Sequence, residues 1–148
     1  MSLKKSLIRE TITPALQGVT KEAVIEELVE LLVAAGRIKD RMAAVRAVLE
    51  RERKMSTGMQ NGIAIPHGKT DTLDGLVTAL GIKREGLDFD SLDGQPARIF
   101  VMTLSPENRT GPHIQFLAEI SRQLNDPSIR ERLLQATTTD EILNILAE

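Results

Sequence analysis

Hydrophobic residues in the first third of the chain recur at the spacing of two amphipathic helices. Thr20 is a suitable N-cap and Gly36 a suitable stop, so the first helix is expected over residues 20–35. A second helix is expected to begin after Asp40 and to end near Arg53. The apolar positions that define the two stripes are Val24, Ile25, Leu28, Leu31 and Leu32, then Met42, Val45, Val48 and Leu49.

Three short apolar segments in the middle of the chain are predicted to be strands. Pro66 lacks a backbone donor and Gly68 relaxes the turn, so the first strand should stop where His67 begins, at the end of a sheet. Between the second and third strands, glycines and aspartates mark turns, and Phe89 with Leu92 is expected to pack that loop against the core. The three segments are Ile63–Ile65, Leu76–Lys83 and Arg98–Leu104.

Helical spacing returns in the last third of the chain. Pro112 suits the first position of a helix that ends near Asn125. Asp126 and Pro127 begin a short helix, and Thr138 with Glu141 forms a capping box for a last helix through residue 146. Along the 148 residues the predicted order is helices, then strands, then helices again. This order predicts the α/β class. The expected architecture is a single domain over residues 1–148, with a mixed β-sheet flanked by α-helices.

Composition narrows the range of partners. Aromatic residues make up only 2% of the chain, which disfavours a site that stacks bases or sugar rings. A net charge of -2, with no long run of either sign, argues against nucleic acid and anionic membrane as partners. The absence of cysteine excludes disulfides and thiol chemistry and fits a reducing compartment. No stretch has the roughly 20 apolar residues of a membrane span, and none resembles a signal peptide. We therefore expect a cytoplasmic protein without membrane insertion.

The candidate chemistry centres on two histidines, His67 and His113. An unperturbed imidazole, with a pKa of about 6.5, is mostly unprotonated at neutral pH and can attack phosphorus. His113 falls in the first turn of the helix that Pro112 opens, where the helix dipole disfavours an imidazolium. His113 is therefore expected to stay neutral and to donate or orient, which leaves His67 as the nucleophile.

A phosphoryl group on His67 needs surrounding donors, and four nearby residues are candidates. Arg51 ends the preceding helix and offers a planar fork that lysine cannot supply. Ser56, Thr57 and the Gly58 amide, on the loop before the first strand, are candidate phosphate ligands. Each residue also has an ordinary structural interpretation, because histidines beside proline and glycine occur in turns and an arginine suits any helix C-terminus.

Metal and nucleotide chemistry are both disfavoured. The two histidines lack the H-E-x-x-H spacing of a metal site and no cysteine supports one. The chain also lacks the G-x-x-x-x-G-K-[ST] loop of proteins that bind ATP directly. No cofactor is expected, and any phosphoryl group is expected to arrive from another protein.

The run S-T-G-M-Q-N-G-I-A-I-P-H-G-K, from Ser56 to Lys69, closely resembles the phosphorylation-site signature of the fructose/mannitol-type enzyme IIA domains (EIIA type 2) of the bacterial phosphotransferase system. The resemblance extends over nearly the whole chain, including the pair Arg51-Glu52 and the segment 113–124. It implies a mixed β-sheet flanked by helices. Gln60 departs from the signature, since many members have glycine there.

The resemblance implies a phosphoryl carrier. His67 would accept the phosphoryl group from the phosphohistidine of the small carrier HPr, or of its nitrogen-branch paralogue, and pass it to a cysteine of an enzyme IIB domain for sugar uptake. By position in the motif, His113 matches the second active-site histidine of the family and Arg51 its active-site arginine.

Two alternatives remain open beside the sugar carrier. In the nitrogen-regulatory branch, the charge added at His67 would control binding to proteins outside transport. A degenerate domain that only binds would not be phosphorylated at all. Partner contacts are expected from apolar residues such as Met55, Met59 and Ile65, although the two methionines are slightly favoured as core residues.

Overall fold

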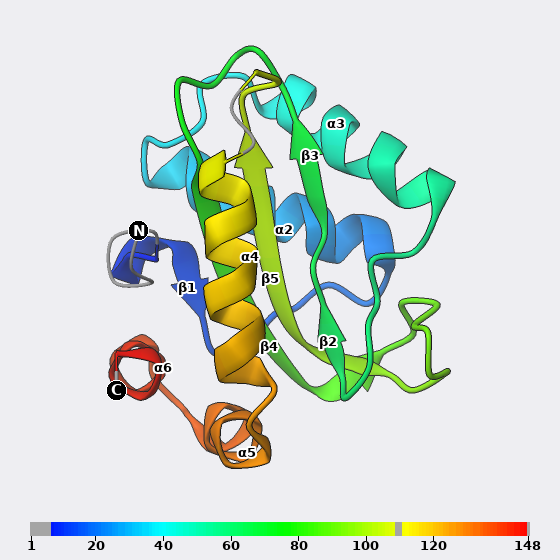
Figure 1. Ribbon diagram of the computed structural model, residues 1–148, viewed down its shortest axis with the longest axis vertical. Coiled ribbons are helices and arrows are strands. Elements are labelled where there is room, and N and C mark those ends of the chain that lie inside the picture. The colour runs from blue at the N-terminus through cyan, green and yellow to red at the C-terminus, as the bar shows by residue number, and fades with distance from the viewer. Residues whose placement is uncertain (1–6, 109–110, 148) are drawn as a thin grey trace.

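The computed structural model describes residues 7–108 and 111–147. Its elements confirm the predicted α/β class, with helices before and after a central group of strands (Figure 1). In chain order they are η1 (Arg9–Thr11), β1 (Ile12–Thr13), α2 (Lys21–Ala34), α3 (Arg41–Lys54), β2 (Ile63–Ala64), β3 (His67–Lys69), β4 (Val77–Leu87), β5 (Ala97–Ser105), α4 (Gly111–Leu124), α5 (Pro127–Gln135) and α6 (Thr139–Leu146).

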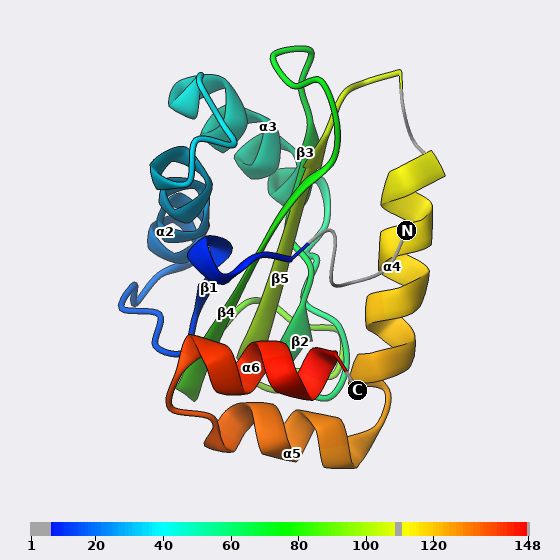
Figure 2. The same cartoon turned by 90° about the vertical axis from the view of Figure 1, so that its left-hand side faces the viewer.

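The five strands form one mixed sheet in the order β1-β4-β5-β2, with β3 also paired to β5. Strands β4 and β5 are antiparallel, and the other pairs are parallel. Helices α2 and α3 cover one face of the sheet, while α4, α5 and α6 lie on the other (Figure 2). The predicted mixed sheet flanked by helices is therefore confirmed, and β1, only two residues long, is an addition to it.

Strand β5 is the centre of the core because both of its faces are buried. Phe100 and Met102 belong to the apolar cluster beneath α2 and α3. Ile99 and Val101 belong to the cluster beneath α4, α5 and α6. Since alternate residues of a strand point to opposite faces, this pattern predicts that Thr103 shares the α4 side with Ile99 and Val101.

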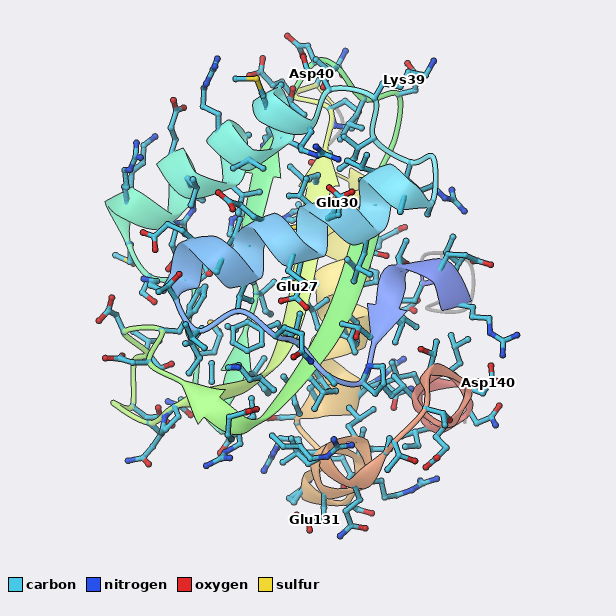
Figure 3. All side chains as sticks on the ribbon, turned by 180° about the vertical axis from the view of Figure 1, so that it is seen from behind. Glu27, Glu30, Lys39, Asp40, Glu131 and Asp140 are labelled. Carbon is cyan, nitrogen blue, oxygen red and sulfur yellow. The ribbon has the colours of Figure 1, made fainter. Side chains whose placement is uncertain are left out.

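Local signals fix the helix ends as predicted. The Thr20 side chain accepts a hydrogen bond from the Ala23 amide at the start of α2. Asp40, labelled in Figure 3 at the start of α3, accepts one from the Ala43 amide at 3.0 Å. After α2, Gly36 has a φ of 75°, a left-handed conformation that glycine adopts without strain. The bounds of both helices lie within one or two residues of the prediction.

The predicted end of the sheet at His67 is wrong. Strand β2 does end early, at Ala64, but His67 begins β3, which pairs with β5 again. The reason is that Pro66 lacks a backbone N–H but keeps a carbonyl oxygen that can still pair with a neighbouring strand. Its carbonyl oxygen accepts from the Thr103 amide at 3.1 Å, so pairing with β5 resumes immediately after the proline.

Three expected burials also need correction. Phe89 is fully buried as predicted, but Leu92 is 69% exposed and does not pack against the core. Met55 and Met59 are 66% and 43% exposed, so neither fills the core. Both methionines lie on the segment before β2, in which Thr57 and Gly58 are buried, so the exposure differs from one residue to the next along it. Within the described residues, no helix is both long and apolar enough to cross a membrane.

Candidate functional site

His67 lies in a short strand between the central strand and α3. In the parallel register of β3 and β5 it is paired with Thr103. Its Nδ1 lies 3.0 Å from the carbonyl oxygen of Ile65. A carbonyl oxygen can only accept, so Nδ1 carries the proton and donates it. In the neutral ring the lone pair is then on Nε2, which is the nitrogen available for nucleophilic attack.

His113 lies in the first turn of α4, and its ring is a close neighbour of the His67 ring on β3. The two ring centroids are 5.5 Å apart, with the ring planes tilted by 43°. His113 Nδ1 lies 3.1 Å from the hydroxyl oxygen of Thr103. The structure thus brings together the two histidines that the sequence singled out, through a helix that begins 44 residues after β3 opens.

Burial lowers the pKa of His113, and the nearby charges of His67 and Lys69 lower it further. A neutral ring at physiological pH agrees with the expectation from sequence. The cause is different, however, because desolvation contributes most, whereas the sequence suggested the helix dipole. A neutral His113 can present one N–H donor and one lone pair.

A depression of about 490 Å³ opens beside His67, between α3 and β3. Its lining is rich in cations, although three carboxylates, those of Glu50, Asp71 and Glu107, also contribute. A larger depression, of about 910 Å³, lies between α2 and α3 and is lined by neither histidine. The smaller depression is therefore the one that adjoins a candidate reactive residue, His67. The cations that line the smaller depression are Arg46, Arg51, Lys54 and Lys69.

Three of these four cations were not identified from sequence. Arg51 and Lys54 lie three residues apart on α3 and share a face of that helix, whereas Arg46 and Arg51 are five residues apart and lie roughly 140° from each other around it. Helical spacing alone therefore does not gather these cations, and it is the packing of α3 against β3 that brings all of them to the depression beside His67. Arg51 itself donates from Nη1 to the Met55 carbonyl oxygen at 2.8 Å, closing the end of α3. Its contact with phosphate stays a prediction.

The loop residues proposed as phosphate ligands are all engaged in contacts within the protein. The Ser56 hydroxyl donates to the Phe89 carbonyl oxygen and accepts from the Gly58 amide at 3.0 Å. The Thr57 amide and hydroxyl both donate to the Glu52 carboxylate, at 3.0 and 2.6 Å. Phosphate binding by Ser56, Thr57 and Gly58 stays a prediction, while their observed contacts hold the loop in place.

Glu52 is the buried anchor of this loop and is only 8% exposed. Besides Thr57, it binds the Lys21 ammonium at 3.0 Å. Lys21 also pairs with Asp90 at 3.1 Å and lies 4.8 Å from the centre of the Phe89 ring. Burial alone would lower the pKa of Lys21, but hydrogen bonds and charges from the two carboxylates outweigh it and raise that pKa. This network joins α2, α3 and the loop that leads to His67.

Among the described residues, no group of three or more His, Asp or Glu side chains is arranged to hold a metal ion. The site therefore consists of two neighbouring imidazoles and a cationic depression. Such an arrangement suits a group that arrives carrying negative charge and forms a bond to nitrogen.

Comparison with known proteins agrees with this chemistry. Residues 5–148 match the family described as "Phosphoenolpyruvate-dependent sugar phosphotransferase system, EIIA 2". The chain is 43% identical over 129 residues to the fructose-specific EIIA component of Haloferax volcanii, covering 87% of this chain and 84% of the relative.

Two solved structures share the fold. The nitrogen regulatory protein IIA-Ntr from Neisseria meningitidis superposes with a TM-score of 0.88 at 30% identity, covering 96% of this chain and 97% of that one. The mannitol enzyme IIA of Escherichia coli, solved in complex with phosphorylated enzyme IIB, gives a TM-score of 0.81 at 30% identity, with 95% and 96% covered. Both the sugar and the nitrogen names therefore occur among similar proteins.

Proposed function

The chain belongs to the EIIA 2 family of the phosphoenolpyruvate-dependent sugar phosphotransferase system, and from that premise we propose that it carries a phosphoryl group on His67 Nε2. The observation that carries the proposal is the hydrogen bond from His67 Nδ1 to the Ile65 carbonyl oxygen, at 3.0 Å. It fixes the ring orientation and leaves Nε2 unprotonated beside the cationic depression.

The transfer step needs no acid or base on His67. The Nε2 lone pair attacks the phosphorus of a donor phosphohistidine, forming a new N–P bond as the donor's N–P bond breaks. The electron pair of the broken bond returns to the donor nitrogen, and the Nδ1 proton stays on His67. In the second transfer a cysteine thiolate of the acceptor forms an S–P bond, and Nε2 recovers its lone pair. Catalysis is then positioning and charge stabilisation.

Three residues around His67 would stabilise the negative charge of the phosphoryl group, each in a different way. Arg51 offers a guanidinium fork to the phosphoryl oxygens. Lys69, next to Gly68 in β3, adds a positive charge to the same depression. The neutral His113 contributes a hydrogen-bond donor without repelling the cations around it.

The proposed donor is HPr or its nitrogen-branch paralogue, and the proposed acceptor is an enzyme IIB domain. The acceptor is supported by the mannitol enzyme IIA of E. coli, which is 30% identical to this chain and was solved with phosphorylated enzyme IIB. Met55 and Met59, with exposed flexible thioethers, and the partly buried Ile65 suit the apolar contacts of such transient complexes.

Sugar uptake is the role that we favour for the carrier. Its support is the 43% identity to a fructose-specific EIIA component, against 30–36% to nitrogen regulatory proteins, that of N. meningitidis included. The second candidate, a nitrogen-regulatory protein that binds partners according to its phosphorylation, is favoured by the high structural similarity to the N. meningitidis protein. Both roles use His67 and differ in where the phosphoryl group goes.

The proposal is tested by intact mass measurement after incubation with phosphoenolpyruvate, enzyme I and HPr. The wild type is expected to gain one acid-labile phosphoryl group, His67→Ala to gain none and His113→Ala to gain it more slowly. Adding an enzyme IIB domain should remove the group if the role is sugar transfer. A folded wild type that gains no mass with either HPr or its nitrogen-branch paralogue would instead indicate a domain that only binds.

A further inference from the structure

Thr103 of β5 is hydrogen-bonded both to the residue that precedes His67 and to His113 itself. Its amide donates to the carbonyl oxygen of Pro66, directly before His67, at 3.1 Å. Its hydroxyl oxygen lies 3.1 Å from Nδ1 of His113. The residue is fully buried, with 0% exposure, so water does not satisfy the hydroxyl.

The direction of the hydroxyl contact decides which nitrogen of His113 carries the proton. Within the described part of the chain, His113 Nδ1 is the hydrogen-bond partner of the Thr103 hydroxyl. A buried hydroxyl proton without an acceptor is more costly than an unused oxygen lone pair, so the hydroxyl donates. Nδ1 of His113 is then the acceptor, and its neutral ring carries the proton on Nε2.

The two imidazoles are therefore in opposite tautomers. His67 is protonated on Nδ1 because a carbonyl oxygen accepts there, whereas His113 is protonated on Nε2 because a hydroxyl donates to its Nδ1. His67 offers the lone pair of its Nε2, and His113 offers the proton of its own Nε2. A nucleophile and a hydrogen-bond donor for the phosphoryl oxygens are what a phosphorylated pair of this kind requires.

We propose that Thr103 is a positioning residue that holds His113 in the Nε2–H tautomer, so that this proton can be donated to a phosphoryl oxygen on His67. The inference rests on the proposed function for its catalytic consequence, but the tautomer can be measured without any phosphoryl transfer. Burial lowers the pKa of His113, so the ring is neutral near neutral pH. Only a neutral imidazole carries its proton on one nitrogen or the other, so the tautomer is defined under these conditions.

The test compares the wild type with Thr103→Val and Thr103→Ser. Valine keeps the branched shape and removes the hydroxyl, while serine keeps the hydroxyl. Long-range ¹H–¹⁵N spectra of the histidine rings, recorded above the usual histidine pKa of about 6.5, report which nitrogen is protonated. The initial rate of phosphoryl uptake from phosphorylated HPr is measured on the same three proteins.

In the wild type, His113 is expected to be protonated on Nε2 and His67 on Nδ1. In Thr103→Val, His113 should gain Nδ1–H character and phosphoryl uptake should slow by about tenfold, the factor of one ordinary hydrogen bond. Thr103→Ser should restore both readouts. The His67 tautomer, set by Ile65, should be the same in all three and serves as the internal control for folding.

Two results would overturn the inference. One is a wild-type spectrum with the His113 proton on Nδ1, which needs no variant to be informative. The other is a Thr103→Val spectrum identical to that of the wild type. If the tautomer responds as expected but no protein takes up a phosphoryl group, the proposed function and the catalytic part of the inference fail, and the tautomer assignment stands.

Discussion

A β-carbon on Gly68 would lie 2.9 Å from the carbonyl carbon of Ala47 and 3.0 Å from the amide nitrogen of Val48. Both contacts are with the backbone of α3, which cannot rotate away as a flexible side chain can. The glycine that follows His67 therefore permits the close approach of β3 to α3. That approach places the strand bearing His67 against the helix bearing Arg51.

We expect Gly68→Ala to lower the free energy of unfolding by about 1–3 kcal/mol, the usual cost of forcing extra volume into a packed site. Phosphoryl uptake should also slow, because β3 must move away from α3. Urea unfolding and the initial rate of mass gain measure the two effects.

The matched control for that variant is Gly75→Ala. Nothing lies within 4 Å of a β-carbon at position 75, so the stability should change by less than about 1 kcal/mol. Equal losses in the two variants would mean that glycine 68 matters only for backbone freedom and not for its contact with α3.

The buried carboxylate of Glu52 is expected to be the main support of the loop before His67. Glu52→Ala removes one of the two carboxylate partners of Lys21 and leaves the Thr57 amide without its acceptor, and should lower the free energy of unfolding by about 2–3 kcal/mol. The expected loss is smaller than for a fully buried ion pair, because the Lys21 side chain is 22% exposed and its charge stays partly solvated. Urea unfolding measures the loss.

Glu50→Ala on the same helix provides the comparison for Glu52. Glu50 is exposed, and its replacement should change stability by less than about 0.5 kcal/mol. Similar effects at the two positions would contradict a special role for the Glu52 network.

Arg51→Lys tests whether the guanidinium fork matters for phosphoryl transfer. Lysine keeps the charge but loses the paired donors, so the uptake rate should fall by about tenfold. Arg53→Lys is the control, because Arg53 lines the depression between α2 and α3 and not the one beside His67. Equal rates for wild type and Arg51→Lys would limit Arg51 to its contact with the Met55 carbonyl oxygen.

Local signals in the sequence were sufficient for most of the fold. The caps at Thr20, Asp40 and Thr138 act within three residues of their helix, and amphipathic spacing repeats within each helix. Such features depend on neighbours in the chain, so the α/β class and the helix bounds could be predicted. The two histidines were found in the same way, from proline and glycine next to them.

Features that depend on pairing between distant segments could not be predicted. Strand β1 has two residues and is defined by its pairing with β4, so no periodicity exists to detect it. The resumption of pairing at His67 depends on the Thr103 amide, which is 36 positions away in the sequence. The exposure of Met55 and the burial of Glu52 likewise follow from what packs on each residue and not from residue type.

The pKa of His113 should lie below the usual value of about 6.5, because the ring is desolvated and because His67 and Lys69 oppose its positive charge. In His67→Ala one of these charges is removed, so the pKa should rise but stay below the usual value. Histidine ring titration followed by NMR measures both. A pKa at or above the usual value in the wild type would contradict the burial of the ring.

The depressed pKa of His113 also predicts how stability depends on pH. The unfolded chain binds the His113 proton at a higher pH than the folded protein, so stability from this group is present above pH ~6.5 and is lost as pH falls through the folded pKa. His113→Asn cannot be protonated and should lose less unfolding free energy than the wild type between pH ~7.5 and ~5. Urea unfolding at the two pH values tests this, and equal losses in both proteins would assign the acid sensitivity to other groups.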